Sequence, residues 1–158
     1  MRADLTEIFG SAGPLARSLP GYAVRDEQVE MAEHVAAALE GRETLIVEAG
    51  TGTGKTFAYL VPALVSGRRV ILSTGTRALQ DQLYHRDLPS VCGALGRPVR
   101  IALLKGRANY LSRHRLDLAE QQAYARGVRR EGALAIPKVR AWSHVTKRGD
   151  IAELPGHG

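Results

Sequence analysis

The stretch Ala49-Gly50-Thr51-Gly52-Thr53-Gly54-Lys55-Thr56 decides how this sequence is interpreted. It departs from the strict G-x-x-x-x-G-K-[ST] pattern only at its first position, where alanine replaces glycine. Glycines allow successive backbone N–H groups to converge on phosphate oxygens, and a following helix adds the positive end of its dipole. In such a loop Lys55 reaches the β- and γ-phosphates, and the Thr56 hydroxyl reaches Mg²⁺. The stretch therefore predicts a site for ATP and Mg²⁺, with Lys55 and Thr56 as its catalytic residues.

The sequence around this loop alternates between predicted strands and predicted helices. Short apolar, β-branched runs predict strands over 44–49, 68–74 and 99–104. Apolar spacing and capping residues predict the helices, which are expected over 26–40, from Lys55 to an interruption at Pro62, over Thr76–Asp87, over Asn109–Arg126 and around 137–145. This order predicts an α/β fold with a parallel sheet and flanking helices. Only three strands are evident, so we expect an incomplete domain.

The composition of the chain excludes several classes of protein. Its 158 residues are 44% hydrophobic and 24% charged, which is typical of a globular domain and not of a disordered tail. No apolar run is long enough to span a membrane, and the N-terminus lacks the pattern of a secretory signal. The single cysteine, Cys92, excludes an internal disulfide framework. We expect a cytoplasmic protein without a membrane partner.

The net charge of +6 is unevenly distributed. Residues 97–148 contain 13 basic and 3 acidic residues, a net charge of +10, so the remainder of the chain is acidic. Lysine and arginine side chains that lie near phosphates release condensed counterions, which favours binding to nucleic acid. A solvated basic face without a partner is the alternative interpretation.

Four stretches together resemble one family. They are GPLARSLPGYAVRDEQVEMAEHV (13–35), VEAGTGTGKTFAYLVPAL (47–64), VILSTGTRALQDQLYHRDLP (70–89) and LLKGRANYLSR (103–113). Their order is similar to that of the XPD-like superfamily 2 DNA helicases of the DinG/YoaA type. The resemblance implies a P-loop NTPase (RecA-like) first motor domain that binds ATP, and translocation on single-stranded DNA, in DNA repair. It divides the chain into an irregular segment (1–24), a partial RecA-like domain (25–108) and the start of an inserted helical region (109–158).

The resemblance also implies roles for residues outside the loop. Arg25 and Gln28 would help to hold ATP, with the Gln28 amide reading adenine, although an exposed pair on an amphipathic helix is the alternative. A segment like 73–83 grips the DNA backbone in the family. The residues that this implies as single-strand contacts are Ser73, Thr74, Thr76 and Gln80. Capping of the following helix by Thr74–Thr76 is compatible with that role.

The segment Lys105–Arg113 resembles the beginning of the family's iron–sulfur insertion. A cysteine of the family corresponds to Ser112 here, so the first thiolate ligand of a cluster is missing. Either the cluster is lost or its ligand is substituted, and we assign no iron to the chain. Lys105 and Arg107 are expected to contact the DNA strand, with solvated charge as the alternative.

Hydrolysis also needs an acidic motif that holds Mg²⁺ and activates water, and no Asp-Glu pair follows a predicted strand after Thr56. Asp81 and Asp87 are interpreted as salt-bridged surface carboxylates. We therefore expect the N-terminal portion of a helicase, inactive alone in ATP hydrolysis, with 5′-to-3′ polarity implied only by the resemblance. Two alternatives remain, a small P-loop kinase and a non-catalytic DNA-binding remnant.

Overall fold

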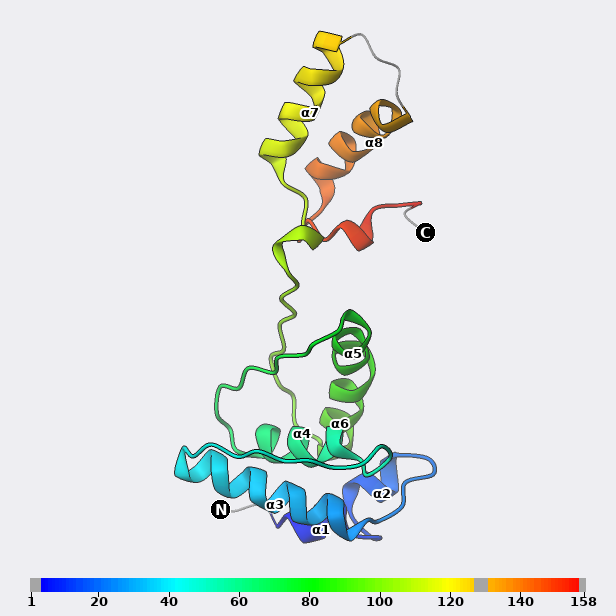
Figure 1. Ribbon diagram of the computed structural model, residues 1–158. Coiled ribbons are helices and arrows are strands. Elements are labelled where there is room, and N and C mark those ends of the chain that lie inside the picture. The colour runs from blue at the N-terminus through cyan, green and yellow to red at the C-terminus, as the bar shows by residue number, and fades with distance from the viewer. Residues whose placement is uncertain (1–3, 127–130, 157–158) are drawn as a thin grey trace. The chain divides into compact units, whose positions relative to one another are not determined.

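The computed structural model describes residues 4–126 and 131–156. The chain forms two compact units, Met1–Ile101 and Ala102–Gly158, and each is described by itself. Figure 1 shows the helices of both units and the extended segments that connect them. No helix among the described residues has the length and apolar character that a membrane span requires.

Two short helices, α1 (Leu5–Phe9) and α2 (Pro14–Ser18), begin the first unit. The carboxylate of Asp4 caps α1 by accepting hydrogen bonds from the backbone N–H groups of Thr6 and Glu7, at 3.0 and 3.3 Å. Phe9 and Leu15 are fully buried and belong to the hydrophobic core. The segment 1–24, which the sequence predicted to be irregular, thus contributes helices to the core.

Helices α3 (Asp26–Gly41) and α4 (Lys55–Val65) pack against each other at the centre of this unit. The fully buried residues Ala32, Ala58, Leu60 and Val61 lie in the core of the unit. Pro62 lies inside α4, which ends three residues later at Val65, consistent with the predicted interruption. The α3–α4 pair positions the glycine-rich loop, because α4 begins at Lys55 and α3 carries Gln28.

A third helical run covers residues 77–95 without a break. It consists of α5 (Arg77–Gln82), the π-helical turn η1 (Leu83–Asp87) and α6 (Leu88–Leu95). Thr76 caps its beginning, and Gly96 ends it with a positive φ of 60°. The buried side chains of Leu83, Leu88 and Val91 attach the run to the core.

The predicted α/β fold is wrong: the described residues form no strand ladder, and so no parallel sheet. The predicted strands 44–49, 68–74 and 99–104 are extended segments without strand assignment. Most of their apolar side chains are exposed, with Ile46 at 92% and Ile71 at 90% exposure, whereas Ile101 is partly buried against the core. A strand is stabilised by the N–H and C=O groups of a neighbouring strand, and these segments do not pair with one another. Apolar, β-branched composition reports a local preference and does not supply that partner.

The second unit is a helical hairpin of α7 (Arg113–Arg126) and α8 (Glu131–Val145), which pack together. Arg140 of α8 joins Glu120 of α7 through hydrogen bonds of 2.8 and 2.7 Å, and it also pairs with Asp117. Near the start of the hairpin, the Lys105 ammonium and the Asp150 carboxylate form an ion pair of 2.9 Å. The 3-10 turn η2 (Arg107–Asn109) follows Lys105 in sequence, and η3 (Ile151–Glu153) follows Asp150.

Candidate nucleotide site

The glycine-rich loop makes a left-handed turn and opens directly into α4. Gly52 and Gly54 have φ values of 85° and 79°, a region that glycine enters without steric cost. Gly54 is the N-cap of α4, so the first N–H groups of an 11-residue helix follow the loop. A helix N-terminus carries unpaired N–H groups and a positive partial charge, both of which favour a bound anion.

The Lys55 side chain folds back onto its own loop. Its ammonium donates hydrogen bonds to the backbone carbonyls of Ala49, at 2.7 Å, and Gly50, at 2.5 Å. The Thr53 hydroxyl donates to the same Gly50 carbonyl at 3.0 Å. An ammonium has three donors, so these bonds fix its position at the loop while leaving one donor for a ligand.

Thr56 lies one residue further into α4 and shares a cavity with Gly54. Burial raises the pKa of Tyr59, the Thr56 side chain lowers it, and the negative charge of Asp87 raises it. Thr56 and Asp87 are therefore both near enough to Tyr59 to influence its ionisation.

A cavity of about 430 Å³ adjoins the loop, within the size range of small-molecule sites. Its wall has three parts: the segment before α3 with Gln28 of α3, the start of α4, and the helical run that contains η1. The lining residues used below are Tyr22, Arg25, Gln28, Gly54, Thr56, Gln82, Arg86, Asp87 and Ser90. Arginine, glutamine and hydroxyl side chains at one end of the glycine-rich loop suit the polar edges of a nucleotide.

Gln28 connects α3 to the loop. It is 2% exposed, and its Nε2 donates to the Gly54 carbonyl at 2.8 Å. The Tyr22 hydroxyl lies 3.3 Å from Gln28 Oε1 and 2.9 Å from the Phe9 carbonyl, which accepts its hydrogen bond. Arg25 is the exposed N-cap of α3 and lines the same cavity. The predicted contacts of Arg25 and Gln28 with ATP stay predictions. Gln28 also holds the glycine-rich loop through the Gly54 carbonyl, a role that the sequence did not indicate.

The residues predicted to contact DNA are divided between the two units. In the first unit, Thr76 Oγ1 caps α5 by accepting from the Leu79 N–H, and the Thr74 hydroxyl donates to the Thr76 carbonyl at 3.2 Å. Ser73 is exposed and Gln80 is half-buried. In the second unit, Arg107 is exposed, whereas the Lys105 ammonium is bound to Asp150. The predicted DNA contacts stay predictions.

Asp87 is the residue that sequence reasoning placed wrongly. It is salt-bridged, as expected, but it is 5% exposed and not a surface carboxylate. Its position could have been found, because Leu83, Asp87 and Val91 are spaced four residues apart and share one face of a helix. The predicted helix ends at Asp87, whereas the structure continues it through Pro89, which stands in the first turn of α6.

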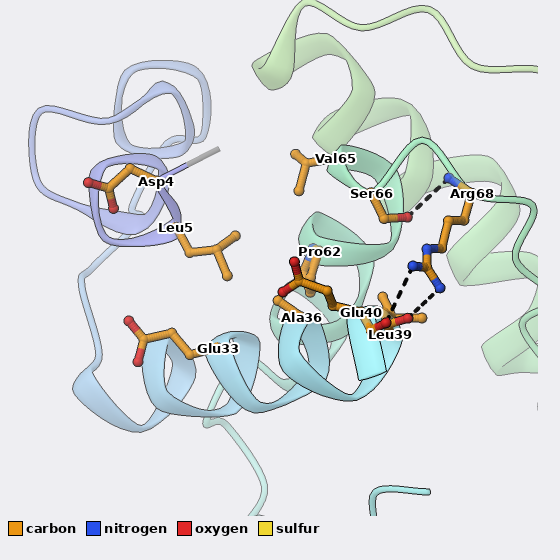
Figure 2. A pocket seen from close by; sticks show the side chains of 10 residues that line it. All are labelled: Asp4, Leu5, Glu33, Ala36, Leu39, Glu40, Pro62, Val65, Ser66 and Arg68. Atoms are coloured by element: carbon orange, nitrogen blue, oxygen red, sulfur yellow. Dashed lines mark hydrogen bonds between the residues drawn. The ribbon is translucent and has the colours of Figure 1, made fainter. Parts of the chain in front are cut away.

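A second cavity, of about 720 Å³, lies away from the loop. Figure 2 shows side chains from α1, α3 and the end of α4 around it, with the Arg68 guanidinium directed at the end of α3. Arg68 donates to the carbonyls of Leu39 and Glu40, at 2.5 and 3.5 Å. This cavity contains no residue of the phosphate loop, so the smaller cavity is the candidate site.

The chain's residues suit Mg²⁺ better than they suit an iron–sulfur cluster. Mg²⁺ takes one or two protein oxygens and completes its shell with waters and phosphates, which the Thr56 hydroxyl beside the loop suits. A four-thiolate iron–sulfur cluster does not fit, because Cys92 is the chain's single cysteine. Ser112 instead caps α7, its Oγ accepting from the Arg115 N–H at 3.3 Å. Among the described residues, no three His, Cys, Asp or Glu side chains gather as a metal site.

Comparison with known proteins gives the family. The sequence profile described as DEAD/DEAH box helicase matches residues 28–122, which include the phosphate loop and Gln28. The chain belongs to the DEAD/DEAH box helicase family. No solved structure matches it.

Three relatives of this DEAD/DEAH box helicase chain carry helicase names. It is 49% identical over 152 residues to the ATP-dependent DNA helicase YoaA of Haemophilus influenzae, covering 95% of this chain and 23% of that protein. It is 50% identical over 149 residues to YoaA of Escherichia coli, covering 94% and 23%. It is 41% identical over 154 residues to the ATP-dependent helicase DinG of Mycobacterium tuberculosis, covering 85% and 23%.

These matches confirm the resemblance to DinG/YoaA-type helicases. They also show that the chain spans about a quarter of the length of these relatives, with 23% of each covered.

Proposed function

We propose that this chain is the nucleotide-binding front portion of an ATP-dependent DNA helicase. The observation that carries the proposal is the position of the Lys55 ammonium, held by the carbonyls of Ala49 and Gly50 where α4 begins. A fixed cation, a helix N-terminus and glycines with positive φ together suit a polyphosphate. The helicase names of the relatives support ATP as the ligand.

The proposal gives the residues of the loop and of the cavity separate tasks. Lys55 and the amides that follow Gly52 and Gly54 hold the phosphates, and Thr56 offers its hydroxyl to Mg²⁺, which neutralises phosphate charge when it is bound. Arg25 and Gln28 lie on the wall that receives the base and ribose. Gln28 keeps the loop in register through the Gly54 carbonyl, so it positions the phosphate site even where it does not touch the base.

Single-stranded DNA is the proposed second ligand. The exposed Ser73, the cap residue Thr76 and the exposed Arg107 supply hydroxyl and guanidinium groups that bind phosphates without base preference. The charge of residues 97–148, from 13 basic and 3 acidic residues, adds a nonspecific attraction. Translocation, a role in DNA repair and a cytoplasmic location belong to the proposal for the whole protein, and we expect this chain alone to bind ATP without hydrolysing it efficiently.

A titration with oligothymidine across salt concentrations tests the DNA part of the proposal. Binding to several phosphates predicts a linear fall of log affinity with log salt, with a slope of about −0.7 for each neutralised phosphate of a single strand. A P-loop kinase would instead change its ATP affinity with a small acceptor molecule and ignore oligothymidine. Absent or salt-insensitive binding of oligothymidine to the chain contradicts the DNA part of the proposal.

A further inference from the structure

The η1 wall of the cavity contains a buried carboxylate that the proposed function does not use. Asp87 is 5% exposed and lines the cavity together with Gly54 and Thr56. Its Oδ2 accepts a hydrogen bond of 2.8 Å from Gln82 Nε2, and its Oδ1 accepts one of 2.9 Å from Arg86 Nε. Because both oxygens accept hydrogen bonds from neighbouring side chains, Asp87 serves as an anchor for them.

The side chain that Asp87 anchors is the Arg86 guanidinium. It is 69% exposed and lines the cavity, so it lies where the cavity opens to solvent. Its Nε–H is directed at Asp87, and a guanidinium has four further N–H donors in the same rigid plane. Fixing one edge of that plane lowers the entropy that is lost when the other edge binds a ligand.

The local backbone explains how the two neighbouring residues can have such different exposure. η1 is a π-helical turn in which the Leu88 N–H bonds to the Leu83 carbonyl, five residues earlier. Adjacent residues of a helical turn point in different directions, so Asp87 is buried while Arg86 remains at the surface. Single π-helical turns inside longer helices frequently occur at functional sites.

We propose that Arg86 is an additional nucleotide-binding residue that contacts the phosphates of the bound nucleotide, and that Asp87 and Gln82 are positioning residues for its guanidinium. The proposal rests on the proposed function, since it names a further contact of the same site. Phosphate is the favoured target because the cavity that Arg86 lines also contains Gly54 and Thr56, the phosphate end of the site. Guanidinium–phosphate hydrogen bonds are charge-assisted and often bidentate.

The test measures the affinity of the 158-residue chain for a fluorescent ATP analogue in four arginine and lysine variants. Arg86→Ala is expected to weaken binding about ten- to a hundredfold, the usual range for a hydrogen bond to a charged group. Arg86→Lys is expected to recover part of the loss, because a lysine keeps the charge without the planar fork. Arg69→Ala, which removes an exposed arginine outside the cavity, is the matched control, and Lys55→Ala tests the phosphate loop itself.

A double-mutant cycle tests the positioning role of Asp87. Asp87→Asn is expected to weaken binding by a similar factor, and Arg86→Ala combined with Asp87→Asn is expected to bind no more weakly than Arg86→Ala alone. In addition, Arg86→Ala should flatten the dependence of affinity on salt, which an uncharged packing role would leave unchanged. Because Arg86 is exposed, its variants should fold normally even where Asp87→Asn does not.

The outcomes separate the two proposals. One outcome is that the chain binds ATP, that Lys55→Ala loses binding, and that Arg86→Ala binds like the control with an unchanged salt slope. In that case the inference about Arg86 is wrong and the proposed nucleotide site stands. If Lys55→Ala binds ATP as tightly as the unmodified chain, the proposed function itself is wrong. Additive losses in the double-mutant cycle overturn the positioning role of Asp87.

Discussion

Gln28 and Gly54 lie so close together that a side chain at position 54 would displace the Gln28 amide. The Gln28 Nε2 lies 2.8 Å from the Gly54 carbonyl oxygen, and a Cβ built on Gly54 would lie 2.0 Å from the same nitrogen. Gly54 also has a φ of 79°, a backbone conformation that residues with a Cβ adopt only with strain. The glycine-rich loop is therefore held in place by a buried residue of α3, 26 residues earlier in the chain.

Gly54→Ala is expected to lower the free energy of unfolding and to weaken ATP binding. The positive φ alone costs roughly 1–3 kcal/mol, and the contact with Gln28 adds to it. Gln28→Ala removes the opposing side chain, so the alanine at position 54 should cost less in that background. Urea denaturation of the unmodified chain, the two single variants and the double variant measures the cost of the alanine in both backgrounds. An equal cost in the two backgrounds would show that Gln28 does not pack against the loop.

Ile71→Lys is expected to change the free energy of unfolding by no more than about 0.5 kcal/mol, because the Ile71 side chain is 90% exposed. Leu60→Ala, at a fully buried position of α4, is the contrasting variant and should cost about 2–5 kcal/mol. Thermal or chemical unfolding compares the two. A large loss in Ile71→Lys would mean that residues 68–74 are buried, contrary to the extended, unpaired segment described above.

The α7–α8 hairpin should lose stability in acid. The Arg140 hydrogen bond holds the pKa of Glu120 below its ordinary value, so the carboxylate stabilises the folded hairpin above the unfolded pKa of about 4.3. That stabilisation is lost as the pH falls through the lowered pKa of the folded state. Hydrogen-exchange protection of α8 amides at pH 6 and pH 3 measures it. Glu120→Gln is the control, and a pH dependence that survives this substitution would exclude Glu120 as its source.

Lys105 and Arg107 should behave differently although both are basic residues of one short segment. Lys105 is paired with Asp150 and only 14% exposed, so Lys105→Met is expected to destabilise the second unit by about 1–3 kcal/mol. Arg107 is exposed, so Arg107→Ala should leave stability unchanged and reduce the salt slope of oligothymidine binding by about 0.7. Should Lys105→Met reduce the slope without destabilising the unit, Lys105 is the DNA contact and its pair with Asp150 is secondary.

The longer helices and the loop could be predicted from the sequence because their signals are local, whereas α1, α2 and α6 were not predicted. Residues that cap or interrupt a helix, such as Thr76 and Pro62, act within one turn, and Gly52 and Gly54 indicate the left-handed turn before Lys55. The sheet could not be predicted correctly, because a strand depends on partners that its own composition does not reveal. Ile46 and Ile71 are apolar and β-branched, and the structure leaves both exposed.

Within the site, the sequence indicated the phosphate loop but not the residues that support it. The Tyr22 hydroxyl bonds to the Phe9 carbonyl, 13 residues earlier, and Asp87 is buried because the 77–95 run packs on the core. Such contacts follow from how α3, α4 and the 77–95 run pack, which no single motif specifies. The helical spacing of Leu83, Asp87 and Val91 was the one available signal for the buried carboxylate.

Equilibrium dialysis of labelled ATP against the chain and its Lys55→Ala variant tests the central claim most directly. Lys147→Ala, which removes an exposed ammonium from the second unit, is the control. We predict saturable binding by the unmodified chain and by Lys147→Ala, and a loss of about a hundredfold in Lys55→Ala, where the cation at the loop is gone. Equal affinity of all three chains for ATP, or no binding by any of them, would contradict the assignment of residues 49–56 as a triphosphate site.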